Sequence, residues 1–262
     1  MRAMGSRRLL LAVVVATALS AASCGNSPTG PSSTANLPLV RETQAMRYYH
    51  EPGDTIEFDR QEVFNAWAVT RLGVQPPRPV EYRKYFDRAA MGRYTGNGNT
   101  NGFAEPELWR FHTIWPFDNH EVVHVYSAIV GRPSDFFNEG LAVSFQTDPF
   151  HGDFTVRFNG VAVHDACRSH LAAGTLPRPL SSYVTTQGFR AITDSVLSYR
   201  MAGSFVLFLK DGYGIDAMET FMRGASRDDS LNTIRMRMVS AFGVSLEDAE
   251  AMWLTLIRGP IP

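Results

Sequence analysis

The sequence is poor in the features that define several classes of protein. Only two cysteines, Cys24 and Cys167, occur in 262 residues, too few for the disulfide framework of a small secreted scaffold. Lys84 and Lys210 are the only lysines, and the 25 Lys and Arg side chains are balanced by 26 Asp and Glu, giving a net charge of −1. This balance excludes a nucleic-acid binder of the usual basic kind and a polybasic membrane-surface protein.

The first residues have the charged, apolar and then small-residue order of a secretory signal. The apolar run, residues 9–19, is shorter than the roughly 20 residues that a membrane-spanning helix needs. Because Cys24 directly follows the small residues, residues 1–23 resemble a bacterial lipoprotein signal, which implies a lipid anchor on Cys24 in the cell envelope, in the periplasm or at the cell surface. Ordinary cleavage with release is the alternative, and two adjacent arginines also fit a twin-arginine signal. Residues 24–36 are rich in Gly, Pro and Ser and predict a flexible tether.

Residues 37–262 have the composition of one domain that buries its own core, since 44% of the chain is hydrophobic and 19% charged. The first part predicts short strands, a helix and a loop. The strand-like runs are residues 43–51, 78–86 and 103–112, the helix is 55–73, and the Gly- and Asn-rich loop is 92–102. From Pro116 onward helical periodicity dominates, with helices expected near 116–130, 134–147, 160–173, 194–211, 214–225, 229–242 and 245–257. A small mixed sheet followed by helices is the α+β fold class.

One pentapeptide, His120-Glu121-Val122-Val123-His124, carries the strongest chemical signal and reads H-E-x-x-H. Residues four apart share one face of a helix, so both imidazoles reach one ion while Glu121 lies beside it. By composition alone this pattern arises by chance in roughly 1% of such chains. Two histidines and a glutamate among valines are also costly to bury without a partner such as a metal.

A catalytic zinc usually takes three protein ligands and keeps one position for water. Glu139, in the segment Phe136-Phe137-Asn138-Glu139-Gly140, follows His124 by fifteen residues and lies in the next expected helix. A short turn between two helices makes them neighbours and brings Glu139 towards the histidines. The competing H-E-x-x-H-x-x-G-x-x-H arrangement does not apply, because Ser127 and Val130 stand at its glycine and third-histidine positions.

The segments HEVVH, FFNEGLAVSF and SYRMAGSFVLFLKDGYG together resemble the gluzincin zinc metallopeptidases. The resemblance covers about residues 40–225 and is closest to bacterial peptidase-MA-like domains and the aminopeptidase-N catalytic core. It implies a thermolysin-like fold, one zinc ion held by His120, His124 and Glu139, and a peptide or protein substrate. Glu121 is then the general base that activates a zinc-bound water and later the acid that protonates the leaving amine.

In aminopeptidase-N relatives the tyrosine of a Tyr-x-x-Gly motif donates a hydrogen bond to the oxyanion. Tyr199 is the candidate here, although Gly203 follows it by four residues rather than three, and a tyrosine packed in the core is the other interpretation. The Gly-x-Met-Glu-Asn motif that binds the substrate amine is not found before His120. The expected function is therefore zinc-dependent peptide hydrolysis, with a non-catalytic envelope binding or structural lipoprotein as the alternative.

Other polar residues give weaker signals. His164, Cys167 and His170 recur every third residue and spread over some 120° of helix surface, so we do not expect them to converge on a metal. His112 and Trp115 precede the motif and are candidates for the wall of a cleft or for simple packing. Asn138 is a candidate for contacting substrate or for bracing the helix of Glu139.

Overall fold

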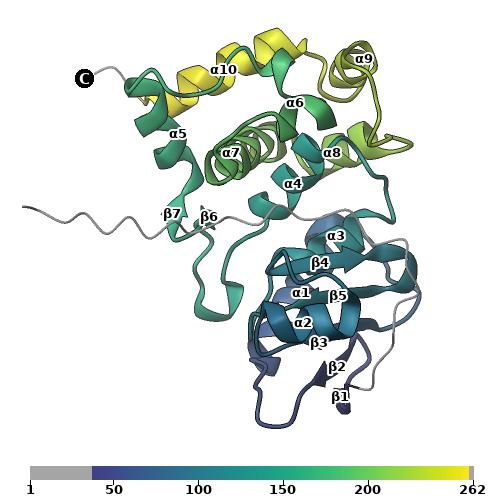
Figure 1. Ribbon diagram of the computed structural model, residues 1–262. Helices are drawn as coiled ribbons and strands as arrows, with labels where there is room; N and C mark the ends of the chain where they lie inside the picture. Colours follow the sequence, from purple (N-terminus) through teal and green to yellow (C-terminus); the bar gives the residue numbers. More distant parts are fainter. Residues whose placement is uncertain (1–36, 260–262) are drawn as a thin grey trace, which may run out of the picture.

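The structure, a computed structural model, describes residues 37–259. The expected signal of residues 1–23, the tether of residues 24–36 and the acylated Cys24 lie outside the described residues. Within residues 37–259 a strand-rich part precedes a helical part, as expected for a mixed α and β chain (Figure 1). The strands are β1 (Leu39–Glu42), β2 (Met46–His50), β3 (Val80–Lys84), β4 (Gly102–Glu105), β5 (Arg110–Thr113), β6 (Arg157–Phe158) and β7 (Val161–Ala162).

The first five strands form one mixed sheet in the order β1-β2-β3-β5-β4, and β6 and β7 form a separate hairpin. The inner pairs β2/β3 and β3/β5 are parallel, whereas β1/β2 and β4/β5 are antiparallel. Helix α1 (Phe58–Leu72) packs through Phe64 on the sheet face that carries Tyr82 and Phe111. Helix α2 (Arg88–Thr95) packs through Met91 on the opposite face, against Phe103. The strand β4 is left at one edge of the sheet.

The helical part is built around α7, which α4, α5, α8 and α10 contact (Figure 1). Every helix expected after residue 116 is present, with ends shifted by a few residues. No helix within residues 37–259 has both the length and the apolar character needed to cross a bilayer. The helices are α3 (Glu121–Ser127), α4 (Asp135–Ser144), α5 (Val163–Ala172), α6 (Thr186–Arg190), α7 (Ser195–Tyr213), α8 (Ile215–Met222), α9 (Leu231–Phe242) and α10 (Leu246–Arg258).

Two expectations for the N-terminal part are wrong. The stretch 92–102 is not all loop, because α2 continues to Thr95, with the Asp87 carboxylate accepting the Ala90 N–H at its start. The run 103–112 is not one strand, because a short 3-10 turn with Trp109 in the left-handed region (φ 54°) separates β4 from β5. In the first case a helix cap outweighs the Gly- and Asn-rich composition, and in the second a turn interrupts the strand-like pattern.

The crossing of α4 and α7 sets the position of Glu139, and two glycines allow the helices to meet closely. A Cβ on Gly140 would lie 2.6 Å from Val206 Cγ2 and 2.7 Å from the Ala202 carbonyl oxygen. A Cβ on Gly203 would lie 2.2 Å from Val143 Cγ1. Neither contact is sterically possible, so any larger residue would push the helix that carries Glu139 away from α7.

We therefore expect Gly140→Ala to lower the free energy of unfolding by about 1–3 kcal/mol, the usual cost of overpacking a core. Urea unfolding followed by circular dichroism measures the change. Gly212→Ala is the matched control, since Gly212 also lies in a helix but has nothing within 4 Å of its Cβ position. That variant should be as stable as the wild type or more stable by up to about 1 kcal/mol. Equal stability of Gly140→Ala and the wild type would contradict the close crossing.

Candidate metal centre

The start of α3 is held by a polar clamp rather than by Pro116, so the helix begins five residues later than expected. The Asp118 carboxylate oxygen Oδ1 accepts the backbone N–H groups of His120, at 2.9 Å, and Glu121, at 2.8 Å. Gln61 of α1 in turn donates to the Asp118 carbonyl and accepts its N–H, both at 3.0 Å. All of these groups are buried. The clamp satisfies two free N–H groups at the helix start and fixes its position against α1.

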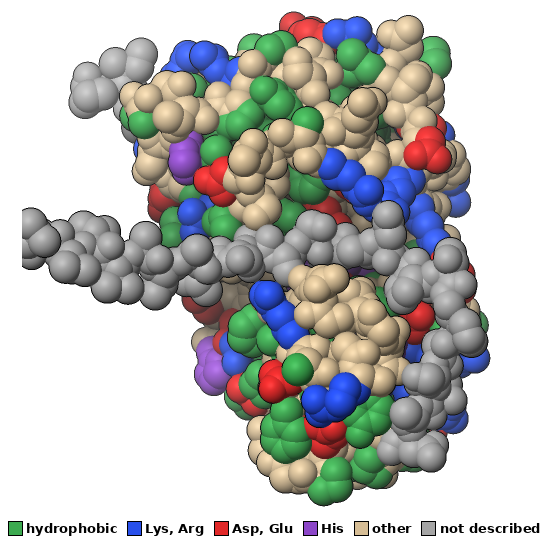
Figure 2. All heavy atoms as spheres, in the orientation of Figure 1, with side chains coloured by type: hydrophobic (Ala, Val, Ile, Leu, Met, Phe, Trp, Pro, Cys, Tyr) green, Lys and Arg blue, Asp and Glu red, His purple; other side chains and the backbone are tan. Residues whose placement is uncertain are grey.

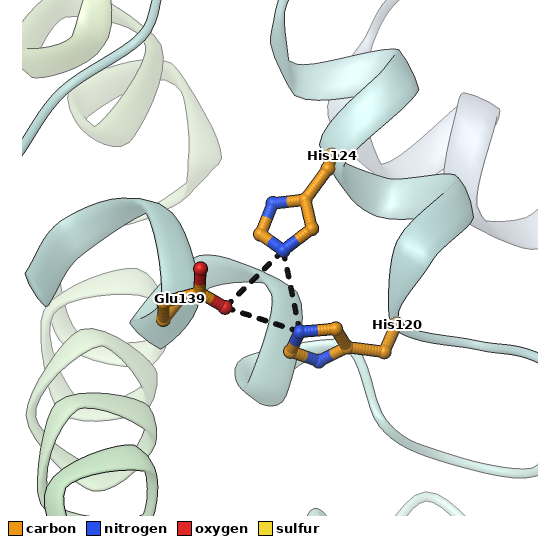
Figure 3. A group of neighbouring side chains, drawn as sticks. All are labelled: His120, His124 and Glu139. Carbon is orange, nitrogen blue, oxygen red and sulfur yellow. Dashed lines mark hydrogen bonds and ion pairs between the residues drawn. The ribbon is translucent and has the colours of Figure 1, made fainter. Parts of the chain in front are cut away.

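His120, His124 and Glu139 point towards one another across the α3–α4 boundary (Figure 3). The two Nε2 atoms are 3.2 Å apart, and each lies 3.2 Å from Glu139 Oε2. The three ligand atoms therefore form an equilateral triangle. The structure thus brings Glu139 into contact with both histidines, while metal binding by the three side chains stays a prediction.

The size of this triangle suits a zinc ion. Ligand atoms placed tetrahedrally about 2.0–2.1 Å from zinc are about 3.3–3.4 Å apart, close to the 3.2 Å separations found here. Two imidazole nitrogens and one carboxylate oxygen are also a donor set of the catalytic zinc type, with three protein ligands. The residues present thus fit one zinc ion in both spacing and chemistry.

Hydrogen bonds alone do not account for the triangle. Each Nε2 offers a single direction, a proton or a lone pair, in the plane of its ring, yet each has two polar neighbours at 3.2 Å. A proton can serve one of these neighbours, whereas a cation between the three atoms serves all of them. The three residues are at most 9% exposed, so bulk water contributes little to their hydrogen bonding.

The charges of the triad influence one another strongly. Burial lowers the pKa of His124, but the adjacent Glu139 carboxylate outweighs it and raises the pKa of His124 to about 9. Burial acts to raise the pKa of Glu139, yet His124 and His120 hold it well below its usual range. A hydrogen bond with the Asn138 side chain also raises the pKa of His124. The carboxylate therefore remains ionised, as a metal ligand must be.

Glu121 lies beside the triad and beneath the edge strand β4. A Cβ on Gly102 would lie 2.8 Å from Glu121 Cγ and 2.9 Å from its Oε1, so glycine is what lets the strand approach this carboxylate. Burial raises the pKa of Glu121 to about 7, against the opposing effect of His120 and His124. A carboxyl group with such a pKa takes up and releases a proton near neutral pH. The sequence alone does not single out Gly102, because Glu121, which it contacts, lies nineteen residues later in the chain.

Tyr199 of α7 lies at the other end of the site. The centroid of its ring lies 6.0 Å from that of the His120 ring. The ring also stacks on Phe158, with the two centroids 5.1 Å apart. Tyr199, His120 and Glu121 line one cavity, whose wall also includes Trp115. The tyrosine is thus both packed against its neighbours and part of the cavity wall. Trp115 is half exposed there, as a cleft residue would be.

The remaining candidates are placed away from the triad. His112 is buried between the rings of Phe103 and Tyr85 and is hydrogen-bonded to Glu105 and to the Tyr85 hydroxyl, so its role is packing. His164, Cys167 and His170 do not converge, as expected. Their side chains contact the Ser204 hydroxyl, the Arg200 carbonyl and the Thr175 hydroxyl, respectively.

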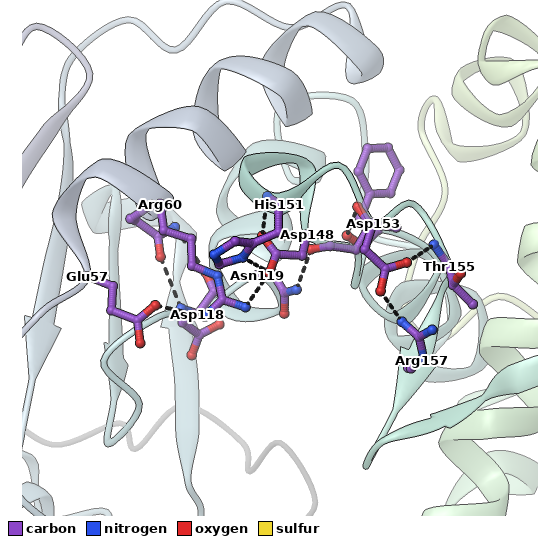
Figure 4. Close-up of polar contacts among 12 residues, drawn as sticks. Glu57, Arg60, Asp118, Asn119, Asp148, His151, Asp153, Thr155 and Arg157 are labelled. Carbon is purple, nitrogen blue, oxygen red and sulfur yellow. Dashed lines mark hydrogen bonds and ion pairs between the residues drawn. The ribbon is translucent and has the colours of Figure 1, made fainter.

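Gln146 of the loop after α4 lines the cavity of Tyr199, and the same loop contains a further group of acids (Figure 4). Asp148 accepts hydrogen bonds from Arg60 and His151, both at 2.7 Å, and Asp153 is paired with Arg157. Asn119 donates to the Thr147 carbonyl at 2.9 Å. Each acid is thus matched by a cation of the chain itself. These contacts fix the loop and do not resemble a second metal site.

Comparison with models of protein families, with curated proteins and with solved structures finds no match for this chain. The case for its function therefore depends on its own residues and their geometry.

We expect the purified chain to bind one zinc ion, and His120→Asn, His124→Asn and Glu139→Gln each to weaken zinc binding at least about 100-fold, since even partners of metal ligands contribute 10- to 100-fold. Competition with a chromogenic chelator measures the affinity. His151→Gln is the control, because this exposed histidine is paired with Asp148, away from the triad.

Zinc binding should also weaken as the pH falls. The imidazoles bind zinc only without their protons, and the raised pKa of His124 means that zinc displaces a proton even at pH 7. Affinity should therefore rise with pH up to about 9 and be largely lost well below pH 6.5. Full zinc occupancy at pH 4, or unchanged affinity in the three ligand variants, would rule out this centre.

Proposed function

We propose that this protein is a zinc metallopeptidase of the gluzincin type, with a thermolysin-like arrangement of its catalytic part. The observation that carries the proposal is the triangle of His120, His124 and Glu139 with the carboxylate of Glu121 beside it. When bound, zinc supplies Lewis-acid activation of a water molecule and of the scissile carbonyl. We also propose that the protein acts at the bacterial cell envelope, because residues 1–23 resemble a lipoprotein signal.

Glu121 performs the proton transfer in the proposed reaction. It accepts a proton from the water that attacks the carbonyl carbon, and it delivers this proton to the amine nitrogen as the C–N bond breaks. Burial raises the pKa of Glu121 above that of an ordinary carboxyl group, and a raised pKa favours the proton uptake that the first half of this cycle needs. Gly102 lets the edge strand approach this carboxylate closely.

Tyr199 is proposed as a donor to the carbonyl oxygen as negative charge develops on it. Its place on the wall of the cavity that His120 and Glu121 also line supports this role. Its four-residue spacing from Gly203 is compatible with it, because α7 turns Tyr199 towards His120 and Gly203 towards Val143 of α4.

A peptide substrate is favoured by the edge strand. Within residues 37–259 β4 pairs with β5 on one side and with no strand on the other. An edge strand offers a row of backbone donors and acceptors that an extended peptide can pair with. Because Gly102 of this strand meets Glu121, a peptide bound along β4 would pass directly over the proposed catalytic group.

The test is hydrolysis of a peptide library by the zinc-loaded chain, its Glu121→Gln variant and its Tyr199→Phe variant. Glu121→Gln should retain zinc and lower kcat/KM by about 10²–10⁴, the usual contribution of general acid–base catalysis. Tyr199→Phe should lower kcat by about 10²–10³ if the hydroxyl stabilises the oxyanion, and should leave kcat unchanged if the ring only packs.

Two results would contradict the proposal. Undiminished hydrolysis by Glu121→Gln would remove the assigned mechanism. No hydrolysis of any library member by the zinc-loaded wild type would favour the non-catalytic binding lipoprotein.

A further inference from the structure

Two adjoining cavities lie on the Tyr199 side of the proposed general base. The first, of about 320 Å³, is the cavity that Tyr199 and Glu121 line. The second, of about 230 Å³, is lined mostly by the loop after α4. Asn119, Gln146 and Asn159 line both cavities, which are therefore joined along these three residues. We call this set of three carboxamide side chains the amide groove.

Most charged side chains along the two cavities are already engaged by the protein itself. The Asp118 carboxylate accepts the backbone N–H groups at the start of α3. In the loop after α4, Asp148 is paired with Arg60 and Asp153 with Arg157 (Figure 4). On the face shown in Figure 2, acidic and basic side chains are interspersed over the part that contains the sheet. These surroundings suit a neutral ligand that forms hydrogen bonds.

The three carboxamides differ in how far the protein uses them. Asn119 Nδ2 donates to the Thr147 carbonyl at 2.9 Å, which holds this side chain in place and leaves its oxygen free to accept from a ligand. Within residues 37–259 the side chains of Gln146 and Asn159 make no hydrogen bond. A carboxamide presents a donor and an acceptor side by side, and so does each residue of a polypeptide main chain.

The backbone beneath the two unused amides is held firmly. Gln146 is hydrogen-bonded through its N–H to the end of α4, at 2.9 Å, and through its carbonyl to β6, at 3.3 Å. Asn159 and Gly160, with φ of 50° and 74°, form the two-residue turn of the β6–β7 hairpin, for which Asn-Gly is a favoured pair. Phe158 of this hairpin stacks on Tyr199. The amides are thus positioned relative to the catalytic part before a ligand arrives, which lowers the cost of binding.

We propose that the amide groove binds the main chain of an extended polypeptide substrate, beyond the residue that occupies the Tyr199 cavity. Each peptide group of such a chain offers one N–H and one C=O, which the carboxamides match whatever the side chains are. The substrate class is therefore an extended polypeptide segment rather than a dipeptide. This inference deepens the proposed peptidase function and takes from it the position of the scissile bond over Glu121.

The first experiment measures binding rather than turnover. Fluorescein-labelled peptides of Ala and Ser with blocked ends are lengthened from two to eight residues, one residue at a time, at the N-terminal or at the C-terminal end. Fluorescence anisotropy gives their affinity for the full, zinc-loaded Glu121→Gln chain. Lengthening at one of the two ends should tighten binding by at least about tenfold in total, since each hydrogen bond contributes about 2- to 10-fold.

Two variants in the same background remove groove amides with little change in shape. Gln146→Met keeps the length of the side chain, and Asn159→Gly keeps the turn, because glycine readily adopts the φ of 50° found there. Each should reduce the gain from lengthening by about 2- to 10-fold. Gln187→Met is the matched control, since Gln187 is exposed on α6 and lines neither cavity. That variant should keep the full gain.

Backbone methylation of the longest peptide identifies the bonded atoms. One N-methyl group removes a single main-chain donor and keeps every side chain. Methylation at one or two positions should weaken binding to the Glu121→Gln chain about 2- to 10-fold. It should have little effect once Gln146 or Asn159 is replaced, because the same hydrogen bond is then already absent. At positions that pair with β4, methylation should weaken binding to every variant alike.

Three results would overturn the inference: affinity that does not depend on peptide length, a full gain in both Gln146→Met and Asn159→Gly, or methylation effects that are the same in every variant at every position. A strong preference for one side chain or a sugar in the groove, without any effect of methylation, would also overturn it.

Hydrolysis of the same peptides by the zinc-loaded wild type separates the two proposals. Length-dependent binding without hydrolysis would remove the peptidase function and leave main-chain binding in the amide groove in place. Hydrolysis with a kcat/KM that depends neither on peptide length nor on the groove residues would do the reverse.

Discussion

A carboxylate buried between two imidazoles is the constraint on which the site depends. The three distances among Glu139 Oε2 and the Nε2 atoms of His120 and His124 are all 3.2 Å. These residues are buried, so water has little access to them. Protons on the imidazoles serve only part of this arrangement, and a divalent cation serves all of it. The cost of burying these groups is the physical reason for which we propose a metal in this triangle.

Much of the surrounding structure serves to hold this triangle. The Asp118–Gln61 clamp sets where α3 begins and therefore where His120 and Glu121 point. The glycine contacts of α4 with α7 bring Glu139 into reach of α3. The sheet contributes its edge strand, whose Gly102 covers Glu121 at close range. The site thus lies where the sheet and the helical part meet (Figure 1), and both are needed to form it.

The features that the sequence predicts well are those encoded by local spacing. Four residues separate His120 from His124, so one helical face brings them together, and the short turn after α3 makes Glu139 the third member. The helices after residue 116, apart from the short and unexpected α6, follow from their periodicity for the same reason. What the sequence does not reveal depends on tertiary contacts: the late start of α3, the approach of Gly102 to Glu121, and the meeting of Asn119, Gln146 and Asn159 in the amide groove. Helix α2 was missed because a single capping aspartate outweighs the Gly- and Asn-rich composition that follows it.

X-ray absorption at the zinc edge on the purified, zinc-loaded chain tests the central claim most directly. The account predicts one zinc ion per chain with two imidazole nitrogens and oxygen donors at about 2.0–2.2 Å, and a spectrum that loses one imidazole in His124→Asn. A coordination shell without histidine, or a spectrum that the His124 change leaves unaltered, would contradict the account.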